Sequence, residues 1–440
     1  CWYLELPGLN FDECLGAAPA VKFLCGSNTE PMQIDPSVIY IFGRPLPVMI
    51  MPYISGLKTL LHIPFYAALG VSTVSTRLMP VTLVTLSIWI FYLAVKKAKD
   101  ARTATLSSLL FAVHPVTVFY MTRDIAPVAI AVLCLSIIFY GLYKWKDDRQ
   151  NTYLTVIAFF SGLGASHKVD FIWMLLSLLP AFLMVYQIKP KLKEILLFAA
   201  GFSMGALPTI VFNFATGFMT LRMAGESFVF WNMPSAFVLR AIQLGQLFSG
   251  GFVGSYFTGI FPLISITSAV IMVYLLFHTN IDSKLSQVLI YTIGIFLLLS
   301  SFAQFSLQIH HLLVLVPLIC VLMADTKLKS AVLLLTVVFM LTSININYDL
   351  KKTGGVGVWS SAINDLNSEL MNSTGTINLR VHAFTESLIV LSKGKLKMRR
   401  VYAGEESYLN GFDLYRDLQP GRKPEEVFFD SQQNIFAVLY

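Results

Sequence analysis

The chain has 440 residues, of which 56% are hydrophobic and only 13% are charged, and its formal net charge is +7. Soluble domains carry about 25% charged residues, so this composition excludes an ordinary soluble protein and indicates an integral membrane protein. With a mean hydropathy of +0.68, the excess of positive charge is typical of lysine-rich loops that face anionic lipid, rather than of a nucleic-acid-binding protein.

The first 77 residues precede the first clear apolar span and carry an acidic pair, Asp12-Glu13. An Asp before a run of small residues is often a helix cap. The same pair could instead supply a general base that accepts a proton from an acceptor hydroxyl or amine.

Two cysteines of this first segment, Cys14 and Cys25, could form a disulfide if the segment lies outside, although their spacing alone does not establish the pairing. The chain starts at Cys1 without a Met or a signal peptide, so we expect a preceding N-terminal piece with room for another span.

The stretch 45–70 is apolar but contains four prolines, Lys58 and His62. We interpret it as an amphipathic helix on the outer surface, because a span here would invert every later loop. Arg44 precedes this stretch on a loop beside the bilayer. There it could contact a lipid headgroup or clamp a phosphate with its fork of donors.

Apolar runs from residue 78 onward predict ten membrane spans, each with uncertain ends. They cover residues 78–95, 104–121, 125–143, 152–166, 170–187, 195–213, 253–277, 287–303, 310–324 and 330–346. A second surface helix is predicted over 235–249, within the long outer loop 214–252.

Lysine and arginine fall on alternate loops, which decides the orientation. One set of loops holds Lys96, Lys97, Lys99, Arg102, Lys144, Lys146, Arg149, Lys189, Lys191, Lys193, Lys284, Lys327 and Lys329, and is therefore cytoplasmic. The opposite loops hold only Arg123, Lys168, Arg222 and Arg240. The first 77 residues and the tail from 347 then lie outside.

Three short outer segments carry further candidate residues. Arg123-Asp124 could be an ion pair with a capping Asp, or could serve a substrate. His167-Lys168-Asp170 fills another very short loop, and His310-His311 starts a span. Adjacent histidines on a helix point about 100° apart, so we predict no metal site there.

The last 90 or so residues change character and predict a small α/β domain on the outer face. The segments TINLRVHAF, SLIVLSKG, KMRRVYAG and EVFFDSQQNIFAVLY have the pattern of short strands, preceded by a helix at SSAINDLNSELMN. We expect three parts: the first outer segment 1–77, the transmembrane domain 78–346 and the α/β domain 347–440.

These features, taken in order, resemble the integral-membrane glycosyltransferases of the GT-C fold, of the protein O-mannosyltransferase and aminoarabinose-transferase type. The resemblance rests on the acidic pair, RPLPVMIMPYISGLK with a following Gly70 and Arg77-Leu78, the turn in FYMTRDIAPVA, GLGASHKVDF and IHHLLVLVPLICVLMA. It covers about residues 10–325. Two departures are Pro45-Leu46-Pro47 in place of a Pro-Pro pair, and a His-His pair without a following Tyr.

The resemblance implies a polytopic helical membrane protein with about 10–11 spans that uses a sugar linked to polyprenyl or dolichyl phosphate. It implies that Asp12 is the general base, with Glu13 as neighbour or substitute, and that the sugar is transferred by inversion. It further implies roles in binding the substrate or its phosphate for Arg44, Arg123, Asp124, Lys168, His310 and His311.

Two other functions stay open from the residues. A transporter or flippase would show internal repeats and mid-span charges, and a non-catalytic cell-envelope assembly protein could share the fold. The sequence does not indicate the sugar, the acceptor (protein, lipid or glycan) or a need for a divalent metal. It predicts a plasma or inner membrane location, or the ER membrane in a eukaryote.

Overall fold

The computed structural model describes residues 4–32, 37–226, 233–250, 261–302, 308–373, 375–380, 384–401, 412–416, 418–419 and 423–440. The chain divides into two compact units. The α/β unit comprises Cys1–Met51, Gly56–Met79 and Asn345–Tyr440, and the helical unit comprises Pro52–Ser55 and Pro80–Ile344.

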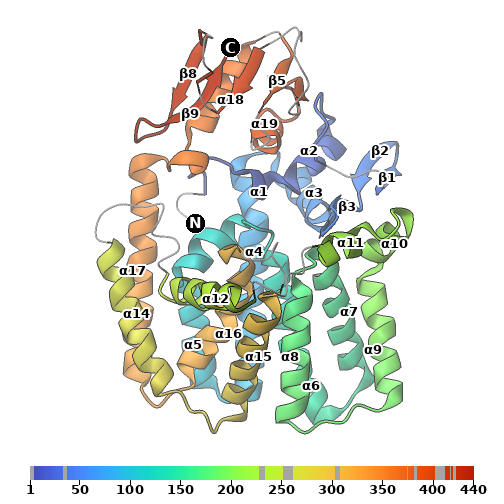
Figure 1. Ribbon diagram of the computed structural model, residues 1–440, viewed down its shortest axis with the longest axis vertical. Helices are drawn as coiled ribbons and strands as arrows, with labels where there is room; N and C mark the ends of the chain where they lie inside the picture. The colour runs from blue at the N-terminus through green and yellow to red at the C-terminus, as the bar shows by residue number, and fades with distance from the viewer. Residues whose placement is uncertain are drawn as a thin grey trace. The chain divides into compact units, whose positions relative to one another are not determined.

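The helical unit is a bundle in which each of the ten predicted apolar segments coincides with one helix or with two consecutive helices (Figure 1). The helices are α4 (Thr73–Ala98), α5 (Ala101–Val113), the π-helix η1 (Thr117–Met121), α6 (Ala129–Asp148), α7 (Asn151–His167), α8 (Phe171–Val185), α9 (Leu192–Gly205), α10 (Leu207–Ala215), α11 (Met219–Glu226), α12 (Met233–Phe248), α14 (Phe261–Phe277), α15 (Lys284–Ser300), the 3₁₀ helix η3 (Ile309–Leu315), α16 (Val316–Ala324) and α17 (Lys329–Thr353). The first turns of α4 and the last turns of α17 belong to the α/β unit. Residues 251–260, part of the predicted span 253–277, lie outside the described residues.

Length and composition single out α4, α6 and α17 as helices able to cross a bilayer alone. The pair α9–α10 would add a fourth such span if both helices are counted together, although it bends by 70° at its break. These statements refer to the described residues. The membrane protein expected from composition and the polytopic helical fold are confirmed; α12 also matches the predicted surface helix 235–249.

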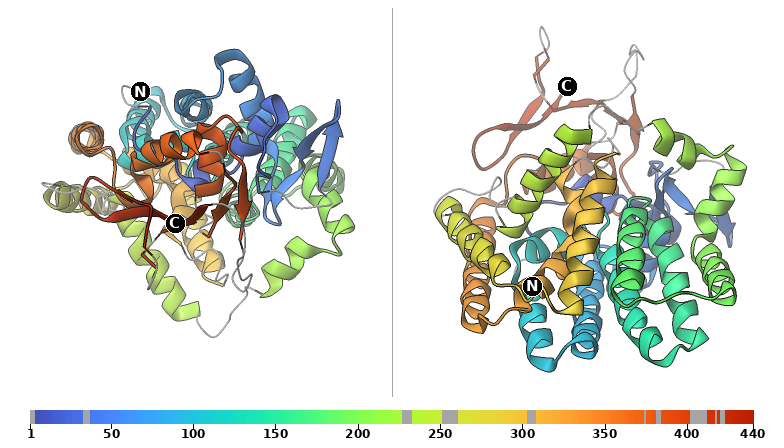
Figure 2. Two further views of the ribbon diagram at one scale, coloured as in Figure 1. Left: turned by 90° about the horizontal axis from the view of Figure 1, so that it is seen from above. Right: turned by 60° about the horizontal axis from the view of Figure 1, so that its bottom comes forward.

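Ion pairs join the basic loops at one end of the helical unit. Lys97 Nζ lies 2.7 Å from Asp147 Oδ2, and Lys99 Nζ lies 3.3 Å from Asp325 Oδ1. Arg149 Nη2 lies 3.2 Å from Glu194 on the next basic loop. Figure 2 shows these connections gathered at the end that is turned forward in its right-hand view. The loops that the lysine pattern groups together therefore share one end of the bundle.

Helices α7 and α9 pack closely through glycines. A Cβ atom on Gly205 would lie 2.0 Å from the Phe159 carbonyl oxygen, and one on Gly162 would lie 2.0 Å from the Phe202 carbonyl oxygen. Gly201 and Gly205 are four residues apart, the spacing by which small residues let membrane helices approach closely. The absence of side chains at these positions sets the distance between the two helices.

The α/β unit is built from both ends of the chain. The N-terminal part contributes α1 (Phe11–Cys14), α2 (Ala17–Cys25), the hairpin β1 (Val38–Ile41) and β2 (Arg44–Pro47), β3 (Met49–Met51) and α3 (Leu57–Leu69). The C-terminal part contributes η4 (Gly357–Trp359), α18 (Ala362–Asn372), β5 (Ile377–Leu379), α19 (Thr385–Leu391), β6 (Met398–Arg400), β7 (Phe412–Tyr415), β8 (Glu426–Phe429) and β9 (Ile435–Leu439). The short strand β4 (Ile54–Ser55) belongs to the helical unit.

The C-terminal sheet has the strand order β6-β5-β7-β9-β8. Strand β5 is parallel to β6 and β7, whereas β9 is antiparallel to β7 and β8. The predicted C-terminal α/β domain is thus confirmed, but SLIVLSKG forms helix α19 rather than a strand. Its β-branched residues favour a strand locally, yet burial of Leu388 and Ile389 against helices of the same unit overrides that preference. In the stretch 45–70 the helix covers only α3, and short strands precede it.

The hydrophobic core of the α/β unit mixes residues from both ends of the chain. Leu9, Cys14 and Val21 share one buried cluster with Leu388 and Ile389. Backbone bonds reinforce this core: Gly8 N donates to the Trp359 carbonyl at 3.1 Å. Figures 1 and 2 show α19 beside α1 and α2. The segments 1–77 and 347–440, treated as separate parts in the sequence, therefore fold together.

Candidate active site

The acidic pair lies on α1, whose N-terminus is capped by Asn10. The Asn10 side chain accepts a hydrogen bond from Asp12 N at 3.0 Å, and Glu13 Oε1 accepts one from Asn10 N at 3.4 Å. This reciprocal pattern is a capping box. It explains why a helix of only four residues begins where the sequence places the two carboxylates.

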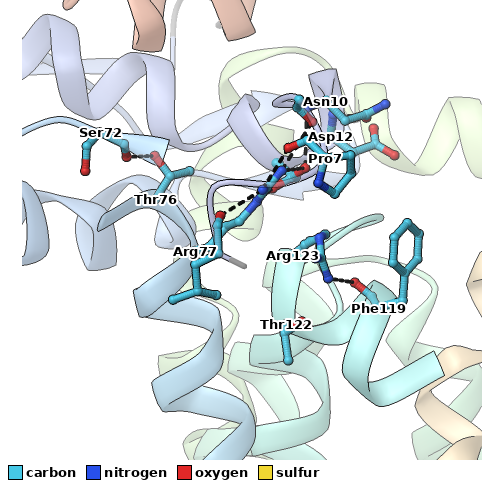
Figure 3. Close-up of polar contacts among 12 residues, drawn as sticks. Pro7, Asn10, Asp12, Ser72, Thr76, Arg77, Phe119, Thr122 and Arg123 are labelled. Carbon is cyan, nitrogen blue, oxygen red and sulfur yellow. Dashed lines mark hydrogen bonds and ion pairs between the residues drawn. The ribbon is translucent and has the colours of Figure 1, made fainter. Parts of the chain in front are cut away.

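Glu13 is fully engaged by Arg77 at the start of α4. Arg77 Nε lies 2.6 Å from Glu13 Oε2, and Nη2 lies 2.9 Å from Oε1, so the pair is bidentate. The guanidinium also donates to the carbonyl oxygens of Leu4, Pro7 and Gly8. Figure 3 shows Arg77 reaching the segment that carries Pro7, Asn10 and Asp12. Arg77 is fully buried and Glu13 nearly so, which makes this pair a clamp on α1.

Asp12 is placed differently from its neighbour. Its side chain is half-buried rather than buried, and its backbone carbonyl accepts a hydrogen bond from Lys58 Nζ at 3.1 Å. Lys58 lies on α3 and is itself buried. The next residue, Cys14, is packed in the core, and burial, with the charge of Glu13 adding to it, raises the pKa of its thiol well above the usual range. Asp12 is therefore less buried than Glu13 on the same firmly held helix.

Both Cys14 and Cys25 are free thiols. Cys14 is buried and Cys25 is exposed, so the two occupy different environments.

Arg44 lies at the start of β2 with its side chain exposed. Its Nη1 donates to the carbonyl oxygens of Phe23 and Leu24, both at 2.9 Å. These carbonyls are in the last turn of α2, where a cation is favourable. The arrangement shows Arg44 capping α2.

Arg123 and Asp124 stabilise the connection between η1 and α6. Arg123 Nη1 donates to the carbonyls of Val118 and Phe119, both at 3.2 Å, and its guanidinium lies 4.8 Å from the Phe119 ring centre (Figure 3). Asp124 Oδ1 accepts from Ala129 N at 2.7 Å, at the start of α6. Asp124 has a positive φ of 52°, which its short side chain tolerates. Both residues hold the ends of helices.

Lys168, His310 and His311 line one small cavity of the helical unit, together with Asp170. Lys168 Nζ donates to the Ala126 carbonyl at 3.0 Å and lies 3.9 Å from Asp170 Oδ2. His311 Nδ1 pairs with the Asp170 carboxylate. Three nitrogen-bearing side chains thus meet around one buried carboxylate. The cavity has room for about one water-sized group, about 20 Å³, so a larger anion must displace side chains to enter.

Arg240 on α12 is a residue that sequence reasoning counted only as loop charge. It is fully buried; its Nη1 donates to Gln243 Oε1 at 3.0 Å and to the Gln308 carbonyl at 3.3 Å. Within the described part of the chain, its Nε and Nη2 are buried without a hydrogen-bond partner. Arg240 is also close enough to Asp170 to interact electrostatically. A buried guanidinium with two unused donors suits an anion.

The candidate residues fall into two groups, each within one unit. Asp12, Glu13 and Arg44 belong to the α/β unit, and the others (Arg123, Asp124, Lys168, His310 and His311) belong to the helical unit. The structure brings Lys168, Asp170, His310 and His311 together, and it adds Arg77 and Arg240 to the candidate residues. Over the described ranges, no cluster of three or more His, Cys, Asp or Glu side chains is suited to hold a metal ion.

Comparison with known proteins agrees with the resemblance drawn from the motifs. Residues 59–213 match the family model described as dolichyl-phosphate-mannose-protein mannosyltransferase. No curated protein sequence matches the chain. Among solved structures, ArnT from Cupriavidus metallidurans bound to undecaprenyl phosphate matches with a TM-score of 0.53 and 10% identity, over 100% of this chain and 95% of that one.

The same ArnT in the apo state matches with a TM-score of 0.45 and 12% identity, over 89% of this chain and 82% of that one. The first match, at low identity, establishes the fold. The chain thus has an ArnT-like GT-C fold, and its residues 59–213 are similar to the mannosyltransferase family, in agreement with the predicted resemblance.

Proposed function

We propose that the chain is a glycosyltransferase that moves a sugar from a polyprenyl-phosphate donor to an acceptor on the extracytoplasmic face, with Asp12 as general base. The observation that supports this assignment is the difference in burial and bonding between the two residues of the acidic pair. Glu13 is buried and bound twice by Arg77, whereas Asp12, one residue earlier on the same helix, is half-buried. The family model and the GT-C fold support the reaction class and the lipid-phosphate donor.

In the proposed step, the Asp12 carboxylate accepts the proton of an acceptor hydroxyl or amine. The acceptor atom forms a bond to the anomeric carbon of the sugar while the bond from that carbon to the phosphate oxygen breaks. The electron pair leaves with the polyprenyl phosphate, and a single direct displacement inverts the anomeric carbon. No metal ion is required for the charges in this scheme to balance.

Lys168, His310, His311 and Arg240 are the residues that we assign to the donor phosphate. Charge-assisted bonds to phosphate are strong when the donors are partly desolvated, and the side chains around this small cavity must move to admit the phosphate. Asp170 orients His311 and limits the positive charge around the cavity. Arg44, Arg123 and Asp124 use their described contacts to hold helix ends, so we assign them to positioning the segments that carry substrate-binding groups.

The lysine pattern supports the extracytoplasmic location. Cytoplasmic loops carry the excess of lysine and arginine. In the helical unit these loops meet at one end through the pairs Lys97–Asp147 and Lys99–Asp325. Lys168 follows α7 at the opposite end from Arg149, which precedes α7. The proposed phosphate-binding residues thus lie away from the lysine-rich end of the bundle.

The test is donor turnover by purified protein in nanodiscs. A panel of polyprenyl-phosphate sugars is supplied with candidate acceptors, and release of free polyprenyl phosphate is followed. We expect Asp12→Asn to lower turnover at least ~100-fold, because a general base contributes about 10²–10⁴. The matched control is Glu30→Gln, an exposed carboxylate of the same unit. Normal turnover by the Asp12 variant would refute its role as the base.

A further inference from the structure

An apolar cavity of about 190 Å³ lies among α6, α7, α8 and α9, near the lysine-rich end of the helical unit (Figure 1). Residues of α6 and α7 form its floor, and residues of α8, α9 and their connection form its edge. The floor includes Trp145, Leu154 and Ile157, and the edge includes Leu183, Pro190 and Ile195. An apolar cavity of about 150 Å³ binds benzene, so this one holds a short stretch of hydrocarbon.

The edge of this cavity reaches the surface of the helical unit. Helix α9 packs mainly against α7, whereas α8 packs mainly against α15. Leu183 is half-buried, and Pro190 and Ile195 are exposed, whereas Leu154 and Ile157 on the floor are buried. An elongated apolar group can therefore enter between α8 and α9 and reach the floor. The surroundings of a membrane helix bundle supply such groups as lipid acyl chains.

The floor also carries a polar group that suits a ligand. Within the described part of the chain, Trp145 Nε1 is buried without a hydrogen-bond partner. A buried indole N–H usually finds a partner, and leaving it without one costs free energy. The Arg149 guanidinium stacks on this ring, with its central carbon 4.4 Å from the ring centre. An occupant that brings a carbonyl oxygen to Trp145 would satisfy the unused donor.

The surroundings of the edge are positively charged. Lys189, Lys191 and Lys193 lie in and just after the connection between α8 and α9, and all three are exposed. Glu194 lines the cavity, but its carboxylate lies 3.2 Å from Arg149 Nη2 and also accepts a hydrogen bond from Lys191 N at 2.7 Å. The one acidic group among the lining residues is thus neutralised within the protein. An anionic headgroup complements the lysines that remain.

We propose that this cavity binds an anionic phospholipid of the leaflet that the lysine pattern assigns to the cytoplasm. One acyl chain enters between α8 and α9, an ester carbonyl accepts a hydrogen bond from Trp145 Nε1, and the phosphate lies among the three lysines. Basic sites between membrane helices on this side are typical of anionic headgroups. The inference is independent of the proposed reaction, because this lipid is not a substrate. The bound chain fills the space between α8 and α9, so it stabilises the helical unit.

Crosslinking with two phospholipid probes tests the site. Phosphatidylglycerol and phosphatidylcholine, each with a photoreactive group on one acyl chain, are titrated into phosphatidylcholine nanodiscs that hold the wild-type protein. Mass spectrometry identifies the labelled peptides. We expect peptides of α8 and α9 to be half-saturated at a mole fraction at least ~10-fold lower for the phosphatidylglycerol probe, because nearby lysines favour anionic lipid. Half-saturation at equal mole fractions would show ordinary lipid contact only and overturn the proposal.

Variants of the cavity itself test entry of the acyl chain. Leu183→Trp places a larger ring at the edge, and we expect it to raise the half-saturating mole fraction of the phosphatidylglycerol probe at least ~10-fold. The matched control is Leu176→Trp, at an exposed leucine of the same helix that does not line the cavity. Trp145→Phe keeps a ring on the floor and removes the donor, which should weaken binding ~3-fold. Unchanged labelling in both cavity variants would overturn the site.

A charge variant tests recognition of the headgroup. Lys189→Gln with Lys191→Gln should reduce the preference for phosphatidylglycerol to less than ~2-fold. The control pair, Lys96→Gln with Lys327→Gln, removes the same charge from exposed lysines of other loops at the same end and should keep the preference. An equal loss in both pairs would show a general surface effect and refute the site. Added phosphatidylglycerol should also raise the unfolding temperature of the wild type but not of Leu183→Trp, a readout that needs no turnover.

Discussion

The most consequential side chain of the α/β unit is Arg77. It binds both oxygens of Glu13 and three backbone carbonyls of the segment that leads into α1. Removing one partner of a buried ion pair leaves an uncompensated charge, which costs about 3–5 kcal/mol. A lysine cannot replace the arginine because it lacks the planar fork that binds a carboxylate twice. Arg77 thus holds the short helix that carries Asp12.

We expect Arg77→Leu to lower the unfolding temperature of the protein and to abolish turnover. Arg77→Leu combined with Glu13→Leu should recover much of the stability, because no buried charge is left unpaired, but not the activity, because α1 loses its clamp. Thermal unfolding in detergent and donor turnover measure the two effects. The control is Lys22→Leu, which removes a pair with a largely exposed Glu30 and should change stability by about 0–1 kcal/mol. Full activity in the double variant would show that the pair does not position Asp12.

For a substitution of Arg240 we predict the opposite effect on stability to that of the Arg77 substitution. Its Nε and Nη2 are buried without a hydrogen-bond partner among the described residues, and unsatisfied buried donors are destabilising. We expect Arg240→Gln to leave stability unchanged or raise it while increasing KM for the donor at least ~10-fold, since one phosphate contact is lost. Arg222→Gln, at an exposed arginine that binds the Thr216 carbonyl, is the control. An unchanged donor KM in the Arg240 variant would remove this residue from the phosphate site.

These residues mark the limit of what could be predicted from the sequence at this scale. The acidic pair was found because it interrupts an apolar context, but the choice between its members depends on Arg77, 64 positions along the chain from Glu13. Lys168 and the two histidines were identified because they are ionisable residues on the side of the membrane where the loops contain few lysines. Arg240 was overlooked because its burial depends on packing that no local pattern of α12 reveals.

Among the elements, the α7–α9 pair shows how membrane helices obtain close contact. Gly205 and Gly162 each face a carbonyl oxygen of the opposite helix at a distance that excludes a Cβ atom. We expect Gly205→Ala to separate the helices and to destabilise the protein by about 1–3 kcal/mol. The control is Gly294→Ala on α15, where an added Cβ meets nothing within 4 Å and helix propensity favours alanine. Equal unfolding midpoints for the two variants would contradict this account.

Apolar runs predicted the helices well because lipid imposes the same requirement on each of them: the backbone must bond within its own segment. The breaks inside the spans were not predictable in this way. α9–α10 and η3–α16 each appear as one hydrophobic run, yet the first is bent by 70° at a break and the second changes from a 3₁₀ helix to an α-helix at Val316. Helix α19 was predicted as a strand because its β-branched residues favour strands and the segment is too short to show a clear helical periodicity. Its burial in the core of the α/β unit determines that it is a helix.

At the scale of the whole molecule, the decisive feature is the core shared by the two ends of the chain. The sequence predicts the segments 1–77 and 347–440 as separate parts, so that deleting residues 350–440 would leave the first segment intact. The structure makes a different outcome the expected one. Deletion removes Leu388, Ile389 and the rest of the core against which Cys14 and Val21 pack, so α1 should lose its support.

We expect a chain lacking 350–440 to lose donor turnover entirely and to expose Cys14. Cys14 is buried with a raised thiol pKa, so it should resist alkylation in the full chain at neutral pH, where the reactive thiolate is scarce. Mass spectrometry after alkylation measures this, with Cys25 as the exposed thiol and Cys320 of α16 as the buried thiol of the helical unit. Protection of Cys14 in the truncated chain would show that α1 folds without the C-terminal segment.

The shared core also determines when the α/β unit can fold during synthesis of the chain. Met32 N donates to Glu386, 354 positions later, and Met398 N donates to Thr29, 369 positions earlier. The first segment is synthesised long before the C-terminal residues that it packs against. Helix α1 can therefore complete its hydrophobic core only after the whole helical bundle has been synthesised. The proposed base is therefore assembled last although it is translated first. On the proposed function, a prematurely terminated chain lacks a positioned base, so turnover of the donor begins only after the C-terminal segment has been made.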